Sequence, residues 1–171
     1  FYDLTEEFSE AQFQEILISE HGGLNEVFAD VAEITGNLKY LTLAKKMSHN
    51  LILDPLANRQ DKLTGMHANT QIPKVVGIAR IAELSGDKNW LKAAEYFWSL
   101  VVEQRTVAIG GNSAREHFHP KDDFNPMLNE VEGPETCNTY NMLKLSMLLY
   151  RQTGQSKYLD YYERGLWNHI L

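Results

Sequence analysis

The sequence predicts an all-α protein built from helical hairpins. One turn phrase occurs three times, the segments around it show helical spacing of apolar residues, and no segment sustains the alternation of a strand. The phrase occupies residues 33–41, 83–91 and 151–159. Each copy has Ser or Thr followed by Gly, a short polar stretch, and then an aromatic residue and Leu. Because a glycine after a helix adopts the left-handed conformation that ends it, each copy predicts a helix, a tight turn and a second helix.

The helices on the two sides of each turn differ in polarity. Those before the turn are apolar nearly all round, which predicts central helices buried on every side, at residues 24–35, 70–84 and 138–152. Those after the turn are amphipathic, which predicts outer helices, at residues 38–50, 88–103 and 156–169, with another at about 6–19. The expected architecture has central helices lining an axis and outer helices wrapped around them.

Composition excludes several classes of protein. A chain of 171 residues forms one compact domain or part of a larger one. Its net charge of −7, with no basic stripe, argues against a nucleic acid or an anionic membrane as partner, and no apolar run is long enough to span a bilayer. The single Cys137 excludes an internal disulfide and an all-cysteine metal site. The chain begins without methionine and ends in the apolar stretch 167–171, so we expect further segments at both ends and leave localisation open.

Polar segments precede the three central helices. The unequal spacing of Gly36, Gly86 and Gly154 indicates an insertion, mainly within 104–136, and insertions in repeat arrays gather on one face. Parallel central helices bring their N-termini, with unpaired N–H groups and positive dipole ends, to one rim. We therefore expect four polar segments to open onto the same end of the bundle: 21–26, 65–71, 116–119 and 135–139. Such a rim suits a neutral, hydroxyl-rich ligand.

The candidates for contact with that ligand share polar side chains at the rim: His67, Asn69, Gln71, Asn25, Glu26 and His117. Asn25 and Asn69 are equally explained as helix caps, and Glu26 sits in a first turn, where the dipole stabilises a carboxylate whatever its function. By contrast, we interpret His49 and His169, on outer helices, as surface or satisfied core histidines. Trp90, Trp98 and Trp167 are interpreted as core residues.

Cys137 allows several interpretations. A lone buried cysteine usually acts as a small apolar residue. At a helix N-terminus its pKa would be lowered, so it could serve as a nucleophile or a metal ligand. The Glu135-x-Cys137 spacing is a weak metal signal, because a closed zinc site needs four ligands and only histidines could complete it within this chain.

Taken together, the motifs resemble the catalytic domain of the β-L-arabinofuranosidase family of glycoside hydrolases (families 127 and 146). The matching pieces occur in the family's order across the chain: residues 22–26, 67–71, 110–111, 116–118 and 135–137, and the turn phrase. The resemblance implies a partial (α/α)6 barrel, about half of the twelve-helix domain, and a retaining glycosidase acting on glycans that contain L-arabinofuranose.

The resemblance also implies roles for individual residues. Glu116 falls at the family's general acid/base, His67 at a substrate-contacting histidine, and Glu135 and Cys137 at two ligands of a zinc held by one Glu and three Cys. The family's nucleophile is a zinc-bound cysteine further along the chain, so Cys137 becomes a ligand and not the nucleophile. We expect the isolated chain to be inactive and to leave its zinc position empty or weakly held.

Two other interpretations remain. A metal-independent (α/α)-barrel sugar epimerase or hydrolase predicts that Glu135 and Cys137 do not converge. A non-catalytic helical-repeat binding module predicts that Glu116 and His67 lie far apart and that 104–136 is disordered. In any of these cases the open edge of a partial barrel could mediate self-association.

Overall fold

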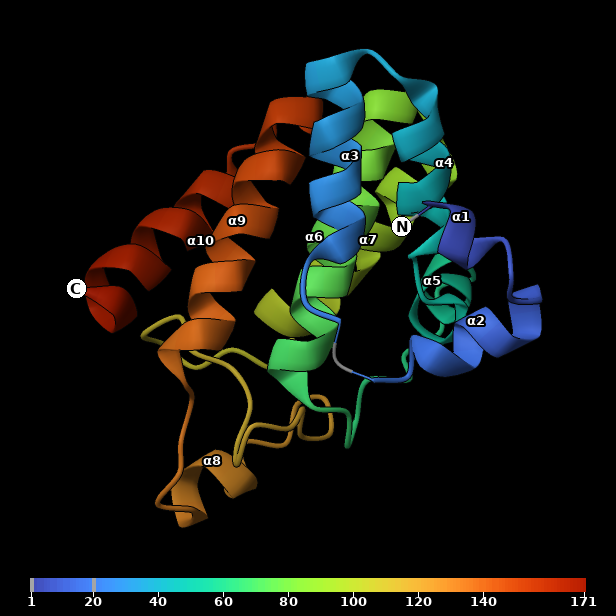
Figure 1. Cartoon of the computed structure of the whole chain (residues 1–171). Helices are drawn as coiled ribbons and strands as arrows, with labels where there is room; N and C mark the ends of the chain where they lie inside the picture. Colours follow the sequence, from blue (N-terminus) through green and yellow to red (C-terminus); the bar gives the residue numbers. More distant parts are fainter. Residues whose placement is uncertain (1, 20) are drawn as a thin grey trace.

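The computed structural model describes residues 2–19 and 21–171, and this part of the chain is all-α, without a strand. Three helical hairpins form its body (Figure 1). Each pairs a central with an outer helix: α3 (Leu24–Thr35) with α4 (Leu38–Lys46), α6 (Ala68–Ser85) with α7 (Lys88–Val102), and α9 (Thr136–Thr153) with α10 (Lys157–Gly165). The remaining helices are α1 (Tyr2–Thr5), α2 (Glu10–Ile16), α5 (Asn50–Ala57), α8 (Asn125–Asn129) and the π-helix η1 (Leu166–Ile170).

The repeated turn phrase forms the three hairpin turns, as predicted. Gly36, Gly86 and Gly154 have φ angles of 67°, 69° and 68°, the left-handed conformation that ends α3, α6 and α9. In the first two copies the residue after the glycine caps the next helix, because the side chains of Asn37 and Asp87 accept hydrogen bonds from backbone N–H groups of α4 and α7. The turn phrase therefore specifies both the end of the central helix and the start of the outer helix that follows it.

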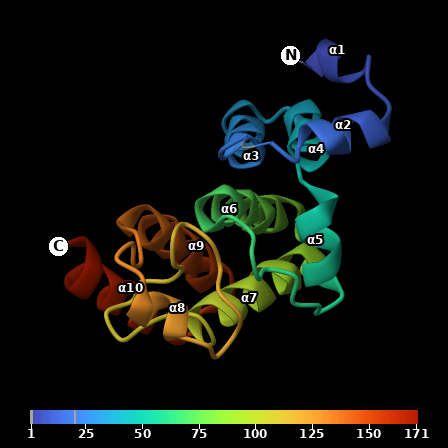
Figure 2. The ribbon, with the colours of Figure 1, turned by 90° about the horizontal axis from the view of Figure 1, so that it is seen from below.

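The central helices lie in one row and run in the same direction. α6 lies between α3 and α9 and packs against both. All three begin at the lower end in Figure 1, and Figure 2 looks onto that end, with α4, α5 and α7 to one side of the row. The prediction of co-directional central helices is confirmed.

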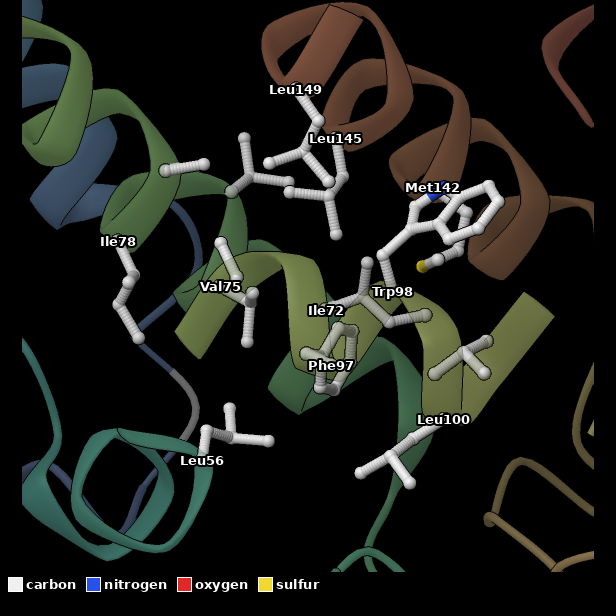
Figure 3. Packing of buried hydrophobic residues seen from close by; sticks show 14 of the residues in the cluster. Leu56, Ile72, Val75, Ile78, Phe97, Trp98, Leu100, Met142, Leu145 and Leu149 are labelled. Atoms are coloured by element: carbon white, nitrogen blue, oxygen red, sulfur yellow. The ribbon is translucent and has the colours of Figure 1, made fainter. Parts of the chain in front are cut away.

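The main core lies where α5, α6, α7 and α9 meet (Figure 3). Apolar side chains of α6, α7 and α9 interdigitate there, among them Ile72, Val75, Phe97, Met142 and Leu145. The indole N–H of Trp98 donates to the hydroxyl of Ser146 at 2.8 Å, so the one polar atom of this large side chain is satisfied inside the core. This core fixes α6 and α9, whose N-termini carry the candidate site.

Burial on every side, predicted for all three central helices, holds for α6 alone. In α3 the side chains of Val27 and Ile34 are 51% and 82% exposed, and in α9 Tyr140 is 60% exposed. The reason is position in the row: α6 has a central helix on each side, whereas α3 and α9 each have one. Apolar composition alone does not distinguish the middle of the row from its edges.

The outer helices also differ from the prediction. The segment 38–50 is interrupted after Lys46, and a separate helix α5 begins at Asn50. Gln14 of α2 stabilises this break, because its side chain donates to the carbonyl of Ser48 and accepts from the N–H of Asn50. The N-terminal helix is shorter than expected. Trp167 is 64% exposed and so is not a core residue.

Across residues 2–19 and 21–171, no helix has both the length and the apolar character needed to cross a bilayer.

Candidate functional site at the N-terminal end of the central helices

His67 is the N-cap of α6 and has one ring nitrogen left for other chemistry. Its Nδ1 accepts a hydrogen bond from the backbone N–H of Thr70 at 3.2 Å. In the neutral ring the proton is therefore on Nε2. That nitrogen lies 3.7 Å from Oε2 of Glu116. Capping thus fixes the tautomer and turns an N–H group toward the carboxylate.

Glu116 is held in a strained tight turn. Ala114 and His117 exchange backbone hydrogen bonds of 3.0 Å, and the two residues between them, Arg115 and Glu116, have φ angles of 48° and 65°. Positive φ at both central positions is the requirement of a type I′ turn, which favours Asn and Gly. Two long side chains in this conformation cost free energy, and such strain clusters at functional sites.

This turn is anchored on both sides. The carbonyl of Glu116 accepts from the N–H of Ala68 at 2.7 Å, which joins the turn to the first residue of α6. On the other side the N–H of Arg115 donates to the carbonyl of Glu132 at 3.0 Å, in the segment that leads to α9. The side chain of Glu116 remains 55% exposed. The carboxylate is therefore accessible while its backbone is fixed.

The residues that follow Glu116 also hold the turn in place. The ring of His117 meets that of His67 edge to face, with centroids 5.3 Å apart, and its Nδ1 lies 2.6 Å from the carbonyl oxygen of Arg115. Phe118 is 1% exposed and packs against Phe97 of α7. The segment from Ala114 to Phe118 thus inserts an aromatic ring into the core and leaves Glu116 at the rim.

Glu135 and Cys137 lie at the start of α9 with their side chains together. Glu135 is the N-cap residue, and the Sγ atom of Cys137 lies 3.5 Å from its Oε2. Burial raises the pKa of the Cys137 thiol, and the hydrogen bond and negative charge of Glu135 raise it further. The lowered pKa expected from a helix N-terminus is therefore wrong for this arrangement.

A carboxylate and a thiol that converge within 3.5 Å match the ligand types of a zinc site. The described ranges hold no group of three or more His, Cys, Asp or Glu side chains suited to a metal ion. The residues present thus fit half of a four-ligand zinc site.

Asn25, predicted at the rim, is instead enclosed in the core. It is 0% exposed, and its amide donates to the carbonyl of Lys74 at 2.9 Å. A Cβ atom at Gly77 would lie 2.0 Å from its Oδ1, so α3 and α6 approach closely at this point. Its burial contradicts the predicted contact with a ligand. Capping does not explain it either, because the N-cap of α3 is Gly23.

The other predicted residues lie on the first turns of α3 and α6. Oε2 of Glu26 pairs with Nζ of Lys144 at 2.8 Å, and Oδ1 of Asn69 accepts from the amide of Asn141 at 2.9 Å. These two contacts join α9 to α3 and to α6. The Oε1 atom of Gln71 is buried and has no hydrogen-bond partner within residues 2–19 and 21–171, which is costly unless a ligand or water supplies one.

Sequence reasoning missed Lys144, Asn141 and His169. Lys144 and Asn141 lie three residues apart, on one face of α9, and their partners are far away in the sequence, so no local pattern indicates them. The sequence alone predicts an ordinary histidine at His169, whereas both of its ring nitrogens contact the segment around Glu135 and Cys137.

Both rival interpretations conflict with this geometry. A scaffold without a site predicts separated Glu116 and His67 side chains, which are 3.7 Å apart, and a disordered 104–136 segment, whose backbone is hydrogen-bonded to α6 and to the start of α9. A metal-independent enzyme predicts that Glu135 and Cys137 diverge, whereas they are 3.5 Å apart.

An all-α array of hairpins that carries carboxylate, histidine and thiol side chains at the N-terminal ends of co-directional central helices is the arrangement expected of part of an (α/α) barrel. The family model described as "Beta-L-arabinofuranosidase, GH127 catalytic domain" matches residues 1–171, and the chain belongs to this family of glycoside hydrolase catalytic domains. No curated protein matches the chain.

Solved structures share the fold. A GH127 beta-arabinofuranosidase is 24% identical with a TM-score of 0.69, and the match covers 85% of this chain and 24% of that one. A GH127 beta-L-arabinofuranosidase from Geobacillus stearothermophilus T6 is 19% identical with a TM-score of 0.63, covering 84% and 27%. A protein described as a glycoside hydrolase is 20% identical with a TM-score of 0.67, covering 84% and 28%. The chain thus spans about a quarter of the length of these proteins.

Proposed function

We propose that this chain supplies the general acid/base and two zinc ligands of a retaining glycoside hydrolase that acts on glycans containing L-arabinofuranose. The observation that carries the proposal is the strained turn that holds an accessible Glu116 carboxylate 3.7 Å from His67. Strain of this kind persists where the surrounding structure enforces it, and here the turn is anchored to α6 on one side and to the segment before α9 on the other.

Glu116 would transfer the proton in both halves of the reaction. As the acid it gives its proton to the departing glycosidic oxygen, and as the carboxylate it then removes a proton from the attacking water. The Nε2–H of His67 faces the same carboxylate and can orient it or donate to a sugar hydroxyl. A fixed backbone under an exposed side chain suits both steps, because the carboxylate must reach the sugar without leaving its position.

Glu135 and Cys137 would hold the zinc. Their side chains already converge, and the raised pKa of the Cys137 thiol means that a metal ion is needed to keep it as thiolate. When bound, zinc supplies the positive charge that stabilises a cysteine thiolate at neutral pH. Cys137 is the only cysteine here, so the remaining ligands and the cysteine nucleophile are assigned to a part of the protein outside this chain.

The rest of the substrate contacts are proposed at the rim. The Oε1 of Gln71, which lacks a partner in the described part of the chain, can accept from a sugar hydroxyl. The amide of Asn69 and the carboxylate of Glu26 lie on the first turns of α6 and α3. The ring of His117 is held against His67 and presents a second imidazole beside Glu116.

The role of Glu116 is tested in the protein that contains this chain by Glu116→Gln, with Glu132→Gln as the matched control at an exposed carboxylate on the same loop. We expect release of L-arabinose from a natural glycan to fall about 100-fold to 10,000-fold for Glu116→Gln and to stay near wild type for Glu132→Gln. An aryl arabinoside with a good leaving group needs little protonation, so its kcat/KM, which reports the step that releases the leaving group, should fall less. An equal loss of kcat/KM on both substrates would contradict the acid role.

The isolated 171-residue chain is proposed to hydrolyse nothing, because it contains one cysteine and half of the zinc ligands. Release of L-arabinose by the purified chain, above that of its Glu116→Gln variant, would overturn this part of the proposal.

A further inference from the structure

His169 lies on the π-helix η1, close to the start of α9. Gly165, the last residue of α10, makes this approach possible: a Cβ atom there would lie 3.2 Å from both Thr139 and Leu143 of α9. The turn at Gly110 approaches the same glycine, since a Cβ at Gly110 would lie 2.7 Å from the Cα of Gly165. This close packing leads η1 back onto the first turn of α9. Single π-turns of this type occur often at functional sites.

Both ring nitrogens of His169 are used. Nδ1 lies 2.7 Å from the hydroxyl oxygen of Thr139, and Nε2 lies 3.2 Å from the carbonyl oxygen of Pro134. A carbonyl oxygen can only accept, so Nε2 carries the proton and Nδ1 accepts from the Thr139 hydroxyl. The imidazole thus connects Pro134, directly before Glu135, with Thr139, two residues after Cys137.

The ring is also held from the side. A Cβ atom at Gly111 would lie 2.8 Å from Cε1 of His169 and 2.6 Å from Cβ of Pro134. Only a residue without a side chain fits here, so the backbone at Gly111 closes the space around the ring and the proline. Thr139 is fully buried. The ring of His169 is therefore held by Thr139, by the Pro134 carbonyl and by the backbone at Gly111.

We propose that His169 is a positioning residue for the metal half-site formed by Glu135 and Cys137. Its ring fixes the distance between Pro134 and Thr139, and with it the direction in which the two ligand side chains leave the start of α9. This inference rests on the proposed function, because it assumes that Glu135 and Cys137 bind zinc. Partners that orient metal ligands typically change metal affinity about 10-fold to 100-fold when they are removed.

The test uses the protein that contains this chain, loaded with Zn²⁺ or Co²⁺ as the probe. His169→Phe keeps a flat ring and removes both hydrogen bonds. We expect it to weaken Zn²⁺ binding about 10-fold to 100-fold and to shift the thiolate-to-cobalt absorption of the Co²⁺ form. His169→Gln, which retains an N–H donor for the Pro134 carbonyl, should recover part of the affinity. The neighbouring Asn168→Ala, at an exposed position, is the matched control and should bind as wild type.

A second variant covers the case in which His169→Phe does not fold. Thr139→Val keeps the shape of the residue and removes one of the two hydrogen bonds, so we expect a smaller loss of Zn²⁺ affinity, about 3-fold to 10-fold. If His169→Phe or Thr139→Val folds and keeps both the Zn²⁺ affinity and the Co²⁺ spectrum of the wild type, the positioning role is overturned.

The same measurements separate this inference from the proposed function. If Glu135→Ala and Cys137→Ala bind Zn²⁺ as tightly as wild type, the metal half-site itself is wrong. If those two variants lose the metal while His169→Phe and Thr139→Val keep it, only the positioning role is wrong.

Discussion

The two ends of the central helices follow different rules. At the C-terminal end the same solution is used three times, with left-handed glycines at Gly36, Gly86 and Gly154 and an ion-pair network centred on Arg80. At the N-terminal end the N-cap residues differ: the side chain of His67 caps α6, whereas Glu135 of α9 and Gly23 of α3 make no side-chain cap bond. The repeated end provides stability, and the end that varies holds the strained turn and the groups suited to chemistry.

The largest expected loss of stability comes from removing the ion pairs at the C-terminal end of the central helices. Arg80 is 10% exposed and ion-paired with Asp30 and Glu83 at 2.6 Å and with Glu33, and Arg151 joins the network at Glu83. Arg80→Met leaves these partly exposed carboxylates without their central cation and should lower the free energy of unfolding by about 2–3 kcal/mol in urea titrations. Arg151→Met, at a half-exposed side chain, should cost less than about 1 kcal/mol. Equal losses would show that Arg80 is not the centre of the network.

The next effect concerns pH at the N-terminal end. Burial and the nearby charge of Lys74 lower the pKa of both His21 and His49 from 6.5 to about 4. The unfolded chain then binds more protons than the folded one between these values, so stability is complete above pH 6.5 and is lost as the pH falls toward 4. Because solvent screens both groups, each histidine should contribute about 1–2 kcal/mol to that loss, measured by unfolding at a series of pH values.

The matched variants are His21→Gln and His49→Gln, which cannot titrate. Both should flatten the dependence of stability on pH. A dependence as steep as that of the wild type in both variants would assign the effect to other groups.

A smaller effect tests the turn glycines. Gly86 has a φ of 69° and open space where a Cβ would lie, so Gly86→Ala changes only the backbone strain and should cost about 1 kcal/mol. Gly133→Ala also meets open space but has no positive φ, and it should be neutral or slightly stabilising. Thermal unfolding compares the two, and an equal cost would remove backbone conformation as the cause.

The smallest expected effect is an increase in stability. Asn tolerates positive φ better than Glu, so Glu116→Asn should raise the free energy of unfolding by about 0.5 kcal/mol while removing the proposed acid. Glu132→Asn, which has no such φ, should change stability in neither direction. A destabilised Glu116→Asn protein would mean that the carboxylate contributes more to folding than the turn costs.

The sequence predicts the repeated end better than the variable one. The turn phrase contains the glycine that stops each central helix, so the bounds expected for α3, at 24–35, agree with Leu24–Thr35. The exposed Val27 and Ile34 could not be predicted, because burial depends on the neighbours of a helix in the row and not on its own composition.

The site is predictable in its parts and not in its contacts. The resemblance to the arabinofuranosidase family singles out Glu116 and His67, but their approach depends on the folded path of a long loop. The ion pair of Glu26 with Lys144 joins residues 118 positions apart. The contacts of His169 depend on a π-turn, and the helical period of α10 gives no sign of one.

The close crossing of α3 and α6 has a consequence for how this chain can vary. Asn25 occupies the space that any side chain at position 77 would need, and its amide also binds the carbonyl of Lys74. A larger residue at 77 therefore requires a smaller one at 25, and the smaller residue cannot make the hydrogen bond to the carbonyl of Lys74. A substitution at position 25 or 77 is therefore tolerated only together with a compensating substitution at the other position.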